Sequence, residues 1–278
     1  MNMYNSRILF YTKYSFQGAS SRYRTYQFDD LLKNAGITFK ISPLFNDEYI
    51  ESLYKKHKLK NKLIAIKCIL SRIINIFKNS NYDLFVIEKE IIPYFPAVFE
   101  WWFFKSKKVF ILDYDDAIFH NYDHGYIKKI LLGRKIPYIM SISNGIIVGN
   151  QYLSDFSKNY NDNTIIVPTS IDLSKYKIIN YEREGPLVIG WIGSPSTSKY
   201  IDEILPALEA VAKKLSCYIH LIGYDDMKND IRNNNFINVI KWNYASEQEE
   251  LQKMDIGIMP LNDLPWERGK SGLKLLQY

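Results

Sequence analysis

Three carboxylates occur within four residues, at Asp113, Asp115 and Asp116, directly after the apolar run KVFIL. Two histidines follow, His120 and His124. Carboxylates crowded at the end of a strand are costly unless they contact a cation, act as a base or bind a hydroxyl-rich ligand. We therefore predict a functional site at this point of the chain.

The same residues admit other interpretations. An apolar strand followed by Asp-x-Asp is the motif of haloacid dehalogenase phosphatases, and Asp113 and Asp115 fit it. That family places Gly-Thr next, however, whereas this chain has Asp116-Ala117. The carboxylates with His120 could also hold a metal ion. In the simplest case Asp116 only caps the segment that follows.

A second group follows the first expected strand, in the segment KYSFQGASSRYR. Gly18 permits a tight turn, and Ser20 and Ser21 can cap the next helix. Arg22 and Arg24 are then expected near the N-terminus of that helix, where cations oppose the macrodipole. Two of them indicate an anionic ligand nearby, although capping alone also explains the segment.

A third group lies in IGWIGSPSTSKY, between a strand and a helix. The amides and hydroxyls of Gly193, Ser194 and Thr197 favour an anion at the helix start, and Lys199 adds positive charge. The motif GxGxxG is missing, so a dinucleotide such as NAD is not indicated. Further along, Tyr224 is expected near a strand end, where its ring could stack on a base or simply pack in the core.

The last residues, PWERGKSGLKLLQY, contain a Gly-Lys-Ser triplet. A Walker A phosphate loop requires glycine five residues before the second glycine, and Leu264 stands there. The segment is therefore not a phosphate loop of that kind.

Short apolar runs alternate with helical patterns along the chain, which is typical of parallel α/β construction. Expected strands are RILFYT, ITFKIS, YDLFVIE, KVFILDY, GIIVGN and TIIVPT, and, in a second series, LVIGWIG, CYIHLIG, INVIKW and DIGIMPL. Helices are expected over 21–36, 96–106, 200–215 and 247–253. We predict two Rossmann-like domains, 1–168 and 186–278, joined by a linker over 169–185, with the second domain incomplete.

The net charge of +6 is concentrated in one segment. Residues 54–78 contain no acid, and their apolar residues recur at helical spacing, which predicts a basic amphipathic helix. It could be a solvated helix with one face on the core, or it could contact an anionic membrane. Its basic residues are Lys55, Lys56, Lys58, Lys60, Lys62, Lys67, Arg72 and Lys78.

Other classes of protein are disfavoured. No nucleic-acid-binding motif accompanies the charge, so we expect no nucleic-acid partner. No run of about 20 apolar residues could cross a bilayer, and the N-terminus lacks a secretory pattern. We expect a cytoplasmic protein, peripheral on the inner face of the cytoplasmic membrane if the basic helix binds lipid.

Taken together, the motifs resemble glycosyltransferase family 4, which has the GT-B fold of two Rossmann-like domains facing each other across a cleft. The motifs are GASSRYRTYQF, LDYDDAIF, IIVGNQYL, VPTSID, IGWIGSPSTSKY, DIGIMPL and WERGKSGLKLLQY. The resemblance implies a retaining transferase that moves a sugar from a nucleotide-sugar donor to a glycan or lipid-linked acceptor, as in bacterial surface polysaccharide synthesis. It implies no cofactor and no essential metal.

The resemblance also assigns roles on the donor side. Gly193 and Lys199 match the family's Gly-Arg-x-x-x-x-Lys element for the donor diphosphate, with Ser194 at the arginine position. Arg268 or Lys270 could replace that cation. Gln277 stands where the family's second Glu binds the ribose, and it can still hydrogen-bond a hydroxyl.

Further roles concern the reaction and the acceptor. The family's first Glu falls on Gly269, with Glu267 two residues away as a candidate. Asp116, with Asp115 beside it, would orient or deprotonate the acceptor hydroxyl. The remaining assignments are Gly18 to the donor site and Arg22, Arg24 and His120 to an acceptor or phosphate.

The family continues beyond the equivalent of Leu273 with further elements, so the resemblance implies a C-terminally truncated chain. Two alternatives stay open. A GT-B-type epimerase would isomerise a nucleotide-sugar without an acceptor. An inactive fragment would only bind one.

Overall fold

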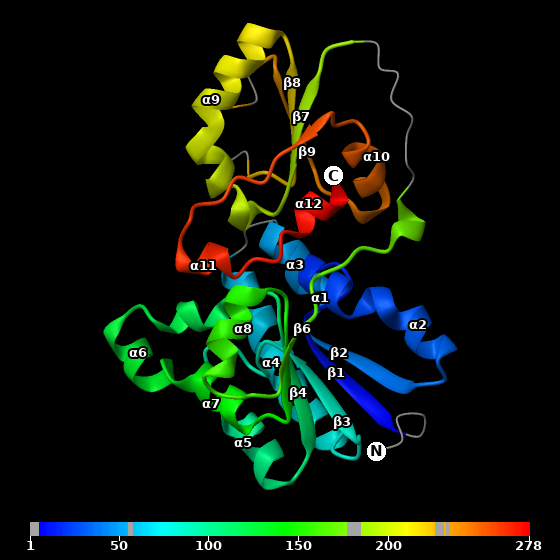
Figure 1. Ribbon diagram of the computed structural model, residues 1–278, viewed down its shortest axis with the longest axis vertical. Helices are drawn as coiled ribbons and strands as arrows, with labels where there is room; N and C mark the ends of the chain where they lie inside the picture. Colours follow the sequence, from blue (N-terminus) through cyan, green and yellow to red (C-terminus); the bar gives the residue numbers. More distant parts are fainter. Residues whose placement is uncertain (1–5, 55–57, 177–184, 226–230, 232–233) are drawn as a thin grey trace. The chain divides into compact units, whose positions relative to one another are not determined.

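The structure is a computed structural model that describes residues 6–54, 58–176, 185–225, 231 and 234–278. It divides into two compact units, which Figure 1 shows with one sheet each. The first comprises Met1–Ser170 and Leu264–Ser271, and the second comprises Ile171–Asp263 and Gly272–Tyr278. The sequence-based division grouped residues 186–278 together, whereas in the structure 264–271 pack with the first unit.

The first unit contains a six-stranded sheet in the order β2-β1-β3-β4-β5-β6, and every pair of neighbours is parallel. Its strands are near-continuous apolar runs, as expected where helices cover a parallel sheet. All six predicted strands are present. They are β1 (Arg7–Tyr14), β2 (Thr38–Phe45), β3 (Leu84–Glu88), β4 (Val109–Tyr114), β5 (Gly145–Val148) and β6 (Thr164–Ile166).

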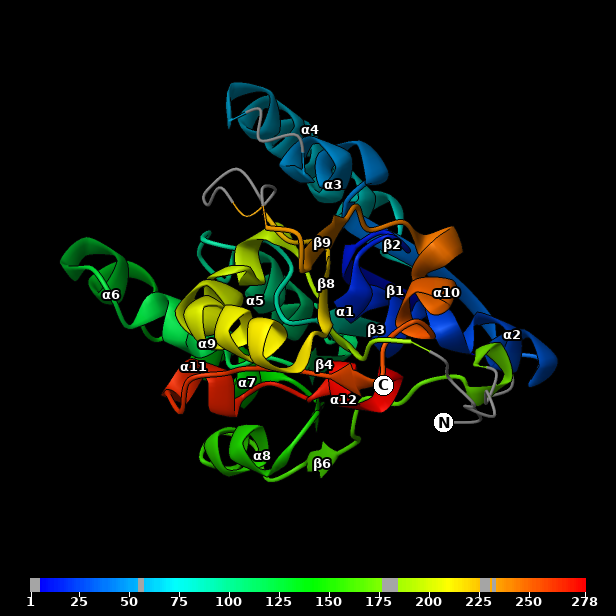
Figure 2. The same cartoon turned by 90° about the horizontal axis from the view of Figure 1, so that it is seen from above.

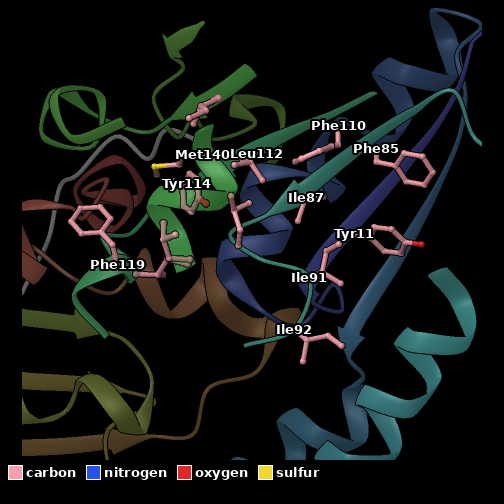
Figure 3. Close-up of a cluster of buried hydrophobic side chains, with 14 of the residues drawn as sticks. Tyr11, Phe85, Ile87, Ile91, Ile92, Phe110, Leu112, Tyr114, Phe119 and Met140 are labelled. Carbon is pink, nitrogen blue, oxygen red and sulfur yellow. The ribbon is translucent and has the colours of Figure 1, made fainter. Parts of the chain in front are cut away.

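The main core of this unit lies on one face of the sheet, to which alternate residues of each strand point. Tyr11, Phe85, Phe110 and Leu112 belong to it (Figure 3). The helices α4 (Lys58–Lys78), α5 (Val98–Lys105) and α7 (Lys135–Ile142) add buried side chains to this core, and two further helices add Leu132 and Leu153. The other helices are α1 (Ala19–Arg24), α2 (Asp29–Asn34), α3 (Asp47–Tyr54), α6 (Tyr126–Leu132), α8 (Gln151–Lys158) and α11 (Pro265–Arg268).

The second unit contains a four-stranded parallel sheet in the order β10-β7-β8-β9. Trp191, Ile201, Ile219 and Leu221 form the centre of its core, between the sheet and α9. All four predicted strands are present. The elements are β7 (Val188–Ile192), α9 (Lys199–Leu215), β8 (Tyr218–Ile222), β9 (Ile237–Ile240), α10 (Glu247–Leu251), β10 (Ile256–Gly257) and α12 (Leu273–Gln277).

One predicted helix, over 21–36, is wrong as a single element. The structure has α1, a 3-10 turn over Tyr26–Phe28, and then α2. Thr25 ends the first helix with a non-helical backbone at φ −133°, ψ −61°, and its N–H bonds to the carbonyl of Ser21. The β-branched residue therefore interrupts a sequence whose apolar spacing alone looks continuous.

The predicted basic helix is present as α4, which begins at Lys58. Residues 55–57 of the predicted segment lie outside the described part of the chain. Figure 2 shows α3 and α4 side by side. Among the described residues, no helix combines the length and apolar character needed to cross a membrane.

Candidate functional site

The strand order of the first unit reverses beside β1, because β2 lies on one side of it and β3 on the other. Ligands of open α/β sheets bind at the carboxyl ends of the strands at such a point. Here Glu88, at the end of β3, is buried with 3% of its surface exposed. Its carboxylate accepts from Ser20 Oγ at 2.7 Å, from Ser21 Oγ at 2.6 Å and from the Lys13 amide at 2.9 Å. Glu88 thus joins the end of β3 to the end of β1 and to the start of α1.

Arg24 and Asp113 form a buried ion pair, with side chains 5% and 9% exposed. Arg24 Nε donates to Asp113 Oδ2 at 3.0 Å, its Nη2 donates to the other carboxylate oxygen, and its Nη1 donates to the Val167 carbonyl at 2.7 Å. Burial raises the pKa of Asp113 to about 6, and Arg24 opposes that rise. The pair fixes α1 against β4 and the segment after β6.

This geometry corrects the expected position of the two arginines. Arg22 and Arg24 lie in the last turn of α1, where cations complement the helix dipole. Arg22 is 5% exposed and lies over the rings of Phe16 and Tyr23. The macrodipole argument for an anion therefore fails, and Arg24 has Asp113 as its partner. Gly18 is the N-cap of α1.

The other two carboxylates meet a buried lysine. Lys89 Nζ lies 2.9 Å from Asp115 and 2.8 Å from Asp116, and its side chain is 4% exposed. Ser20 Oγ lies 2.7 Å from Asp115 Oδ2 as well as from Glu88, so its single proton is shared between two carboxylates. Burial acts to lower the pKa of Lys89, but Asp115 and Asp116 outweigh it and hold that pKa well above the usual value. Lys89 also adopts φ 67°, a left-handed backbone that costs about 1–3 kcal/mol in a non-glycine residue and is typical of functional sites.

Asp116 is the most accessible of the three carboxylates, with 25% of its side chain exposed. A second ammonium group, Lys270 Nζ, lies 3.6 Å from it. Burial alone would raise the pKa of Asp116, but Lys89 and Lys270 outweigh it and hold that pKa well below its usual range. Asp116 is therefore an anion throughout the neutral range and a weak base.

Lys270 belongs to the segment 264–271, which packs on the first unit. Ser271 Oγ donates to the Asp115 carbonyl at 3.1 Å, and Asn150 Nδ2 donates to the carbonyls of Arg268 and Lys270 at 3.3 and 3.2 Å. A Cβ on Gly269 would lie 2.5 Å from that of Ala117, so only glycine allows this approach. Glu267, Arg268 and Lys270 were expected on the donor domain, but their segment belongs to the first unit, where Lys270 lies beside Asp116.

The two ring nitrogens of His120 contact groups other than Asp113, Asp115 and Asp116. Its Nδ1 lies 2.7 Å from Asp123 and its Nε2 lies 2.8 Å from the Tyr152 hydroxyl. The alternative of a metal site built from the three carboxylates Asp113, Asp115 and Asp116 with His120 is therefore not supported. In the described part of the chain, no group of three His, Cys, Asp or Glu side chains is arranged to hold a metal ion.

In the second unit the strand order reverses between β7 and β10, and the turn after β7 is held by its own hydroxyls. Thr197 Oγ1 accepts from the Ser194 amide at 3.1 Å and Ser194 forms a capping box with it. Lys199 is the exposed first residue of the 17-residue helix α9. The amides of Gly193, Ser194 and Thr197, expected to bind the anion, instead donate within the unit to the Ile222 carbonyl, to Thr197 Oγ1 and to the Ser194 carbonyl. The hydroxyls of the turn and a cation at a helix start still suit an anionic group such as a phosphate.

Two glycines allow this turn to form. A Cβ on Gly193 would lie 2.2 Å from the Trp191 ring. Gly223, which follows β8, adopts φ 73°, and a Cβ there would lie 2.2 Å from the Gly193 carbonyl oxygen. The backbones of the two strand ends therefore pass in direct contact.

Tyr224 does not offer the stacking surface that was considered for it. It is 6% exposed, its hydroxyl bonds to Asp202, and its ring meets Trp191 edge to face. Burial thus makes it a core residue.

Gln277 lies on α12, and its Nε2 donates to Glu247 Oε1 at 3.2 Å. Glu247, the first residue of α10, also accepts from Trp242 Nε1 at 2.6 Å. The family pattern has a glutamate where this chain has Gln277. In this unit the carboxylate of Glu247, on α10, lies beside that position. Sequence reasoning singled out Gln277 but missed Glu247, which it treated only as a helix start.

Comparison with known proteins gives similarity at the level of structure. No family model and no curated protein matches the sequence. A glycosyltransferase from Rickettsia africae superposes with a TM-score of 0.58 at 14% identity, covering 91% of this chain and 72% of that one. The UDP-GlcNAc 2-epimerase of Neisseria meningitidis, bound to UDP-GlcNAc, gives 0.55 at 12%, covering 90% and 76%. An alpha-glucosyltransferase in complex with UDP and DNA gives 0.52 at 11%, covering 93% and 73%.

These similarities, together with the two parallel sheets, show the GT-B fold: two Rossmann-like units, the second the smaller. The predicted fold class is confirmed. At such low identity the likeness establishes the fold alone, because one fold hosts many activities.

Proposed function

We propose that this protein is a glycosyltransferase that moves a sugar from a nucleotide-sugar donor to a glycan or lipid-linked acceptor. The observation that carries the proposal is that each Rossmann-like unit has a polar cluster where its strand order reverses. One cluster suits a diphosphate and the other presents an ionised carboxylate, Asp116. Donor diphosphate and acceptor hydroxyl are the two groups that such a reaction must bind.

On the donor side, we assign the diphosphate to the turn Gly193–Thr197 and to Lys199. Negative charge develops on the diphosphate as it departs, so fixed hydroxyls and a cation there lower the barrier most. Gln277 can offer both a donor and an acceptor to ribose hydroxyls, and the buried Glu247 holds its amide in place.

On the acceptor side, the depressed pKa of Asp116 favours one of its two expected roles. A general base works best with a pKa near the working pH, and Asp116 lies far below it. We therefore assign Asp116 to orienting the acceptor hydroxyl by accepting its hydrogen bond, with Asp115 and Lys89 as positioning groups. Lys270 then serves as a cation beside the acceptor rather than within the donor turn.

The resemblance to family 4 carries the finer parts of the proposal. It favours transfer with retention and a role in surface polysaccharide synthesis. The basic amphipathic pattern of residues 55–78, and not the resemblance, suggests a peripheral contact with the inner face of the cytoplasmic membrane. A membrane contact would bring the enzyme to a lipid-linked acceptor.

A second candidate is a nucleotide-sugar epimerase. The epimerase from Neisseria meningitidis superposes almost as well as the Rickettsia glycosyltransferase, at 0.55 against 0.58. Incubation with labelled UDP-, GDP- and ADP-sugars, with and without a membrane extract as the acceptor source, separates the two. We expect free nucleoside diphosphate and a labelled glycan only when acceptor is present. An isomerised nucleotide-sugar formed from donor alone would establish the epimerase instead.

Lys199→Ala should weaken binding of the donor's nucleoside diphosphate about tenfold. The substitution removes one charge-assisted hydrogen bond to phosphate, which is worth roughly 1.5–3 kcal/mol at full strength and less at an exposed site. Titration calorimetry measures the affinity. Lys213→Ala, in the last turn of the same helix, is the matched control and should leave the affinity unchanged. Equal affinity in both variants would remove Lys199 from the donor site.

Asp116→Asn should reduce kcat for transfer about 100-fold, because a misoriented acceptor loses roughly that factor. Because Asp116 titrates well below neutral pH, the shape of the pH–rate profile between pH 6 and 9 should not change. Initial rates across that range provide the measurement, with Asp155→Asn on the exposed face of α8 as control. If instead the rate of the unaltered enzyme falls toward acid pH and this fall disappears in Asp116→Asn, then Asp116 is the general base.

A further inference from the structure

Helix α4 has apolar residues on two opposite sides. One side faces the core, where Ile64, Cys68 and Ile76 are buried. The residues of the other side recur every three or four positions, which places them in one stripe along the helix. That stripe faces solvent and consists of Leu59 (80% exposed), Leu63 (63%), Ile66 (54%), Leu70 (56%), Ile74 (54%) and Phe77 (55%).

Lysines border this stripe. Lys60, Lys67 and Lys78 are exposed along one edge and Lys62 is exposed along the other. The sequence of α4, residues 58–78, contains no acidic side chain. A shallow groove of about 510 Å³ opens between the helix side chains and is lined by Lys67, Leu70, Ser71, Ile74, Asn75 and Lys78. The solvent side of α4 is thus both apolar and cationic.

A second apolar stripe begins where the first ends. The ring of Phe77 meets that of Trp102 on α5, with centroids 5.5 Å apart. On α5, Val98, Trp101 and Phe104 are 45%, 47% and 48% exposed. Their spacing of three residues again defines one side of a helix. Lys105 and Lys107 are exposed at its end, so the same combination of apolar and basic groups continues.

We propose that these two stripes, here called the α4–α5 face, insert into the headgroup region of an anionic lipid bilayer. Contiguous exposed apolar side chains of this extent mark an interaction site. Apolar residues flanked by lysines match an interface whose interior is apolar and whose surface is negative. A second copy of the chain fits less well, because a symmetric contact would place lysines opposite lysines. Membrane contact does not depend on sugar transfer, so its test needs no substrate.

The test is flotation of the full chain with vesicles of phosphatidylcholine, with and without phosphatidylglycerol. We expect binding only to the anionic vesicles. Lys60→Gln/Lys67→Gln/Lys78→Gln should reduce the partition coefficient about 100-fold, since each cation near such a surface contributes about fivefold. Leu63→Ser/Leu70→Ser should reduce it at least about 100-fold, since burying each leucine contributes about tenfold or more. The emission of the unaltered protein should shift to shorter wavelength with anionic vesicles, and Trp101→Phe should diminish that shift.

The control is Lys213→Gln/Lys214→Gln/Leu215→Ser, which changes exposed residues of the same types at the end of α9 in the second unit. It should bind vesicles like the unaltered chain. Two outcomes would overturn the proposal. One is binding that is equal with and without phosphatidylglycerol, or that is unchanged in both α4 variants. The other is a chain that runs as a dimer, becomes a monomer in Leu63→Ser/Leu70→Ser and never floats, because the face would then be a self-association surface.

Discussion

Arg24→Met should lower the free energy of unfolding of this protein by about 3–5 kcal/mol, because it leaves the Asp113 carboxylate buried without its cation. The substitution also removes the hydrogen bond to Val167, so α1 loses its attachment to two parts of the sheet. Urea unfolding followed by circular dichroism measures the loss. Arg7→Met is the matched control, since Arg7 pairs with Asp83 at 3.8 Å with side chains 48% and 42% exposed. An exposed pair of that kind contributes less than about 1 kcal/mol.

The destabilisation by Arg24→Met should depend on pH. Asp113 already has a folded-state pKa of about 6 with Arg24 beside it, and removing Arg24 raises that pKa further. A carboxyl group with a raised folded-state pKa favours the folded state when it is protonated, so the penalty grows as pH rises through the folded pKa. The difference between Arg24→Met and the unaltered chain should therefore be larger at pH 8 than at pH 5.5. A difference that is the same at both values, or no larger than that of Arg7→Met, would show that the pair does not anchor α1.

Gly223→Ala should both destabilise the second unit and abolish donor binding. The new Cβ would lie 2.2 Å from the Gly193 carbonyl oxygen, which is backbone and cannot rotate away. The turn after β7 must therefore move, and with it the side chains assigned to the diphosphate. We expect a loss of about 2–4 kcal/mol in stability, from strain at a special backbone conformation and from overpacking. Affinity for the nucleoside diphosphate should fall at least about 100-fold, because a shift of about 1 Å has an effect of that size.

Gly36→Ala provides the control for backbone strain alone. Gly36 has φ 71°, close to the 73° of Gly223, but no atom lies within 4 Å of its Cβ position. Alanine at either site incurs roughly 1 kcal/mol for a left-handed backbone. Thermal unfolding and calorimetric titration of both variants separate strain from collision. Equal effects of the two substitutions would mean that the contact between Gly223 and Gly193 does not shape the turn.

The fold could be predicted from the sequence because the strands of a parallel sheet covered by helices consist of short runs of apolar residues. VFILDY and LVIGWIG need no tertiary information to be recognised, and both are strands of the structure. The helix over 21–36 failed because apolar spacing does not report the backbone of Thr25, which ends α1 after Arg24. Because α1 ends at Arg24, both arginines lie in the last turn of a short helix and not at the start of a long one.

The site was only partly predictable. Asp116 and the Gly193 turn stand directly after strands, where the sheet rule places ligands. The same rule applied to YDLFVIEKE selects Glu88 and Lys89, so these residues could have been found and were missed. The attachment of 264–271 to the first unit could not be predicted, because it depends on contacts such as Gly269 with Ala117 between residues distant in the sequence.

The most direct test of donor binding by the second unit is calorimetric titration of the unaltered chain with UDP, GDP and ADP. We expect one of the three to bind saturably at one site per chain. Gly36→Ala should retain that binding and Gly223→Ala should lose it. If none of the three diphosphates binds up to millimolar concentration, or if Gly223→Ala binds as tightly as the unaltered chain, the turn after β7 is not a diphosphate site and the assignment of a nucleotide-sugar enzyme is wrong.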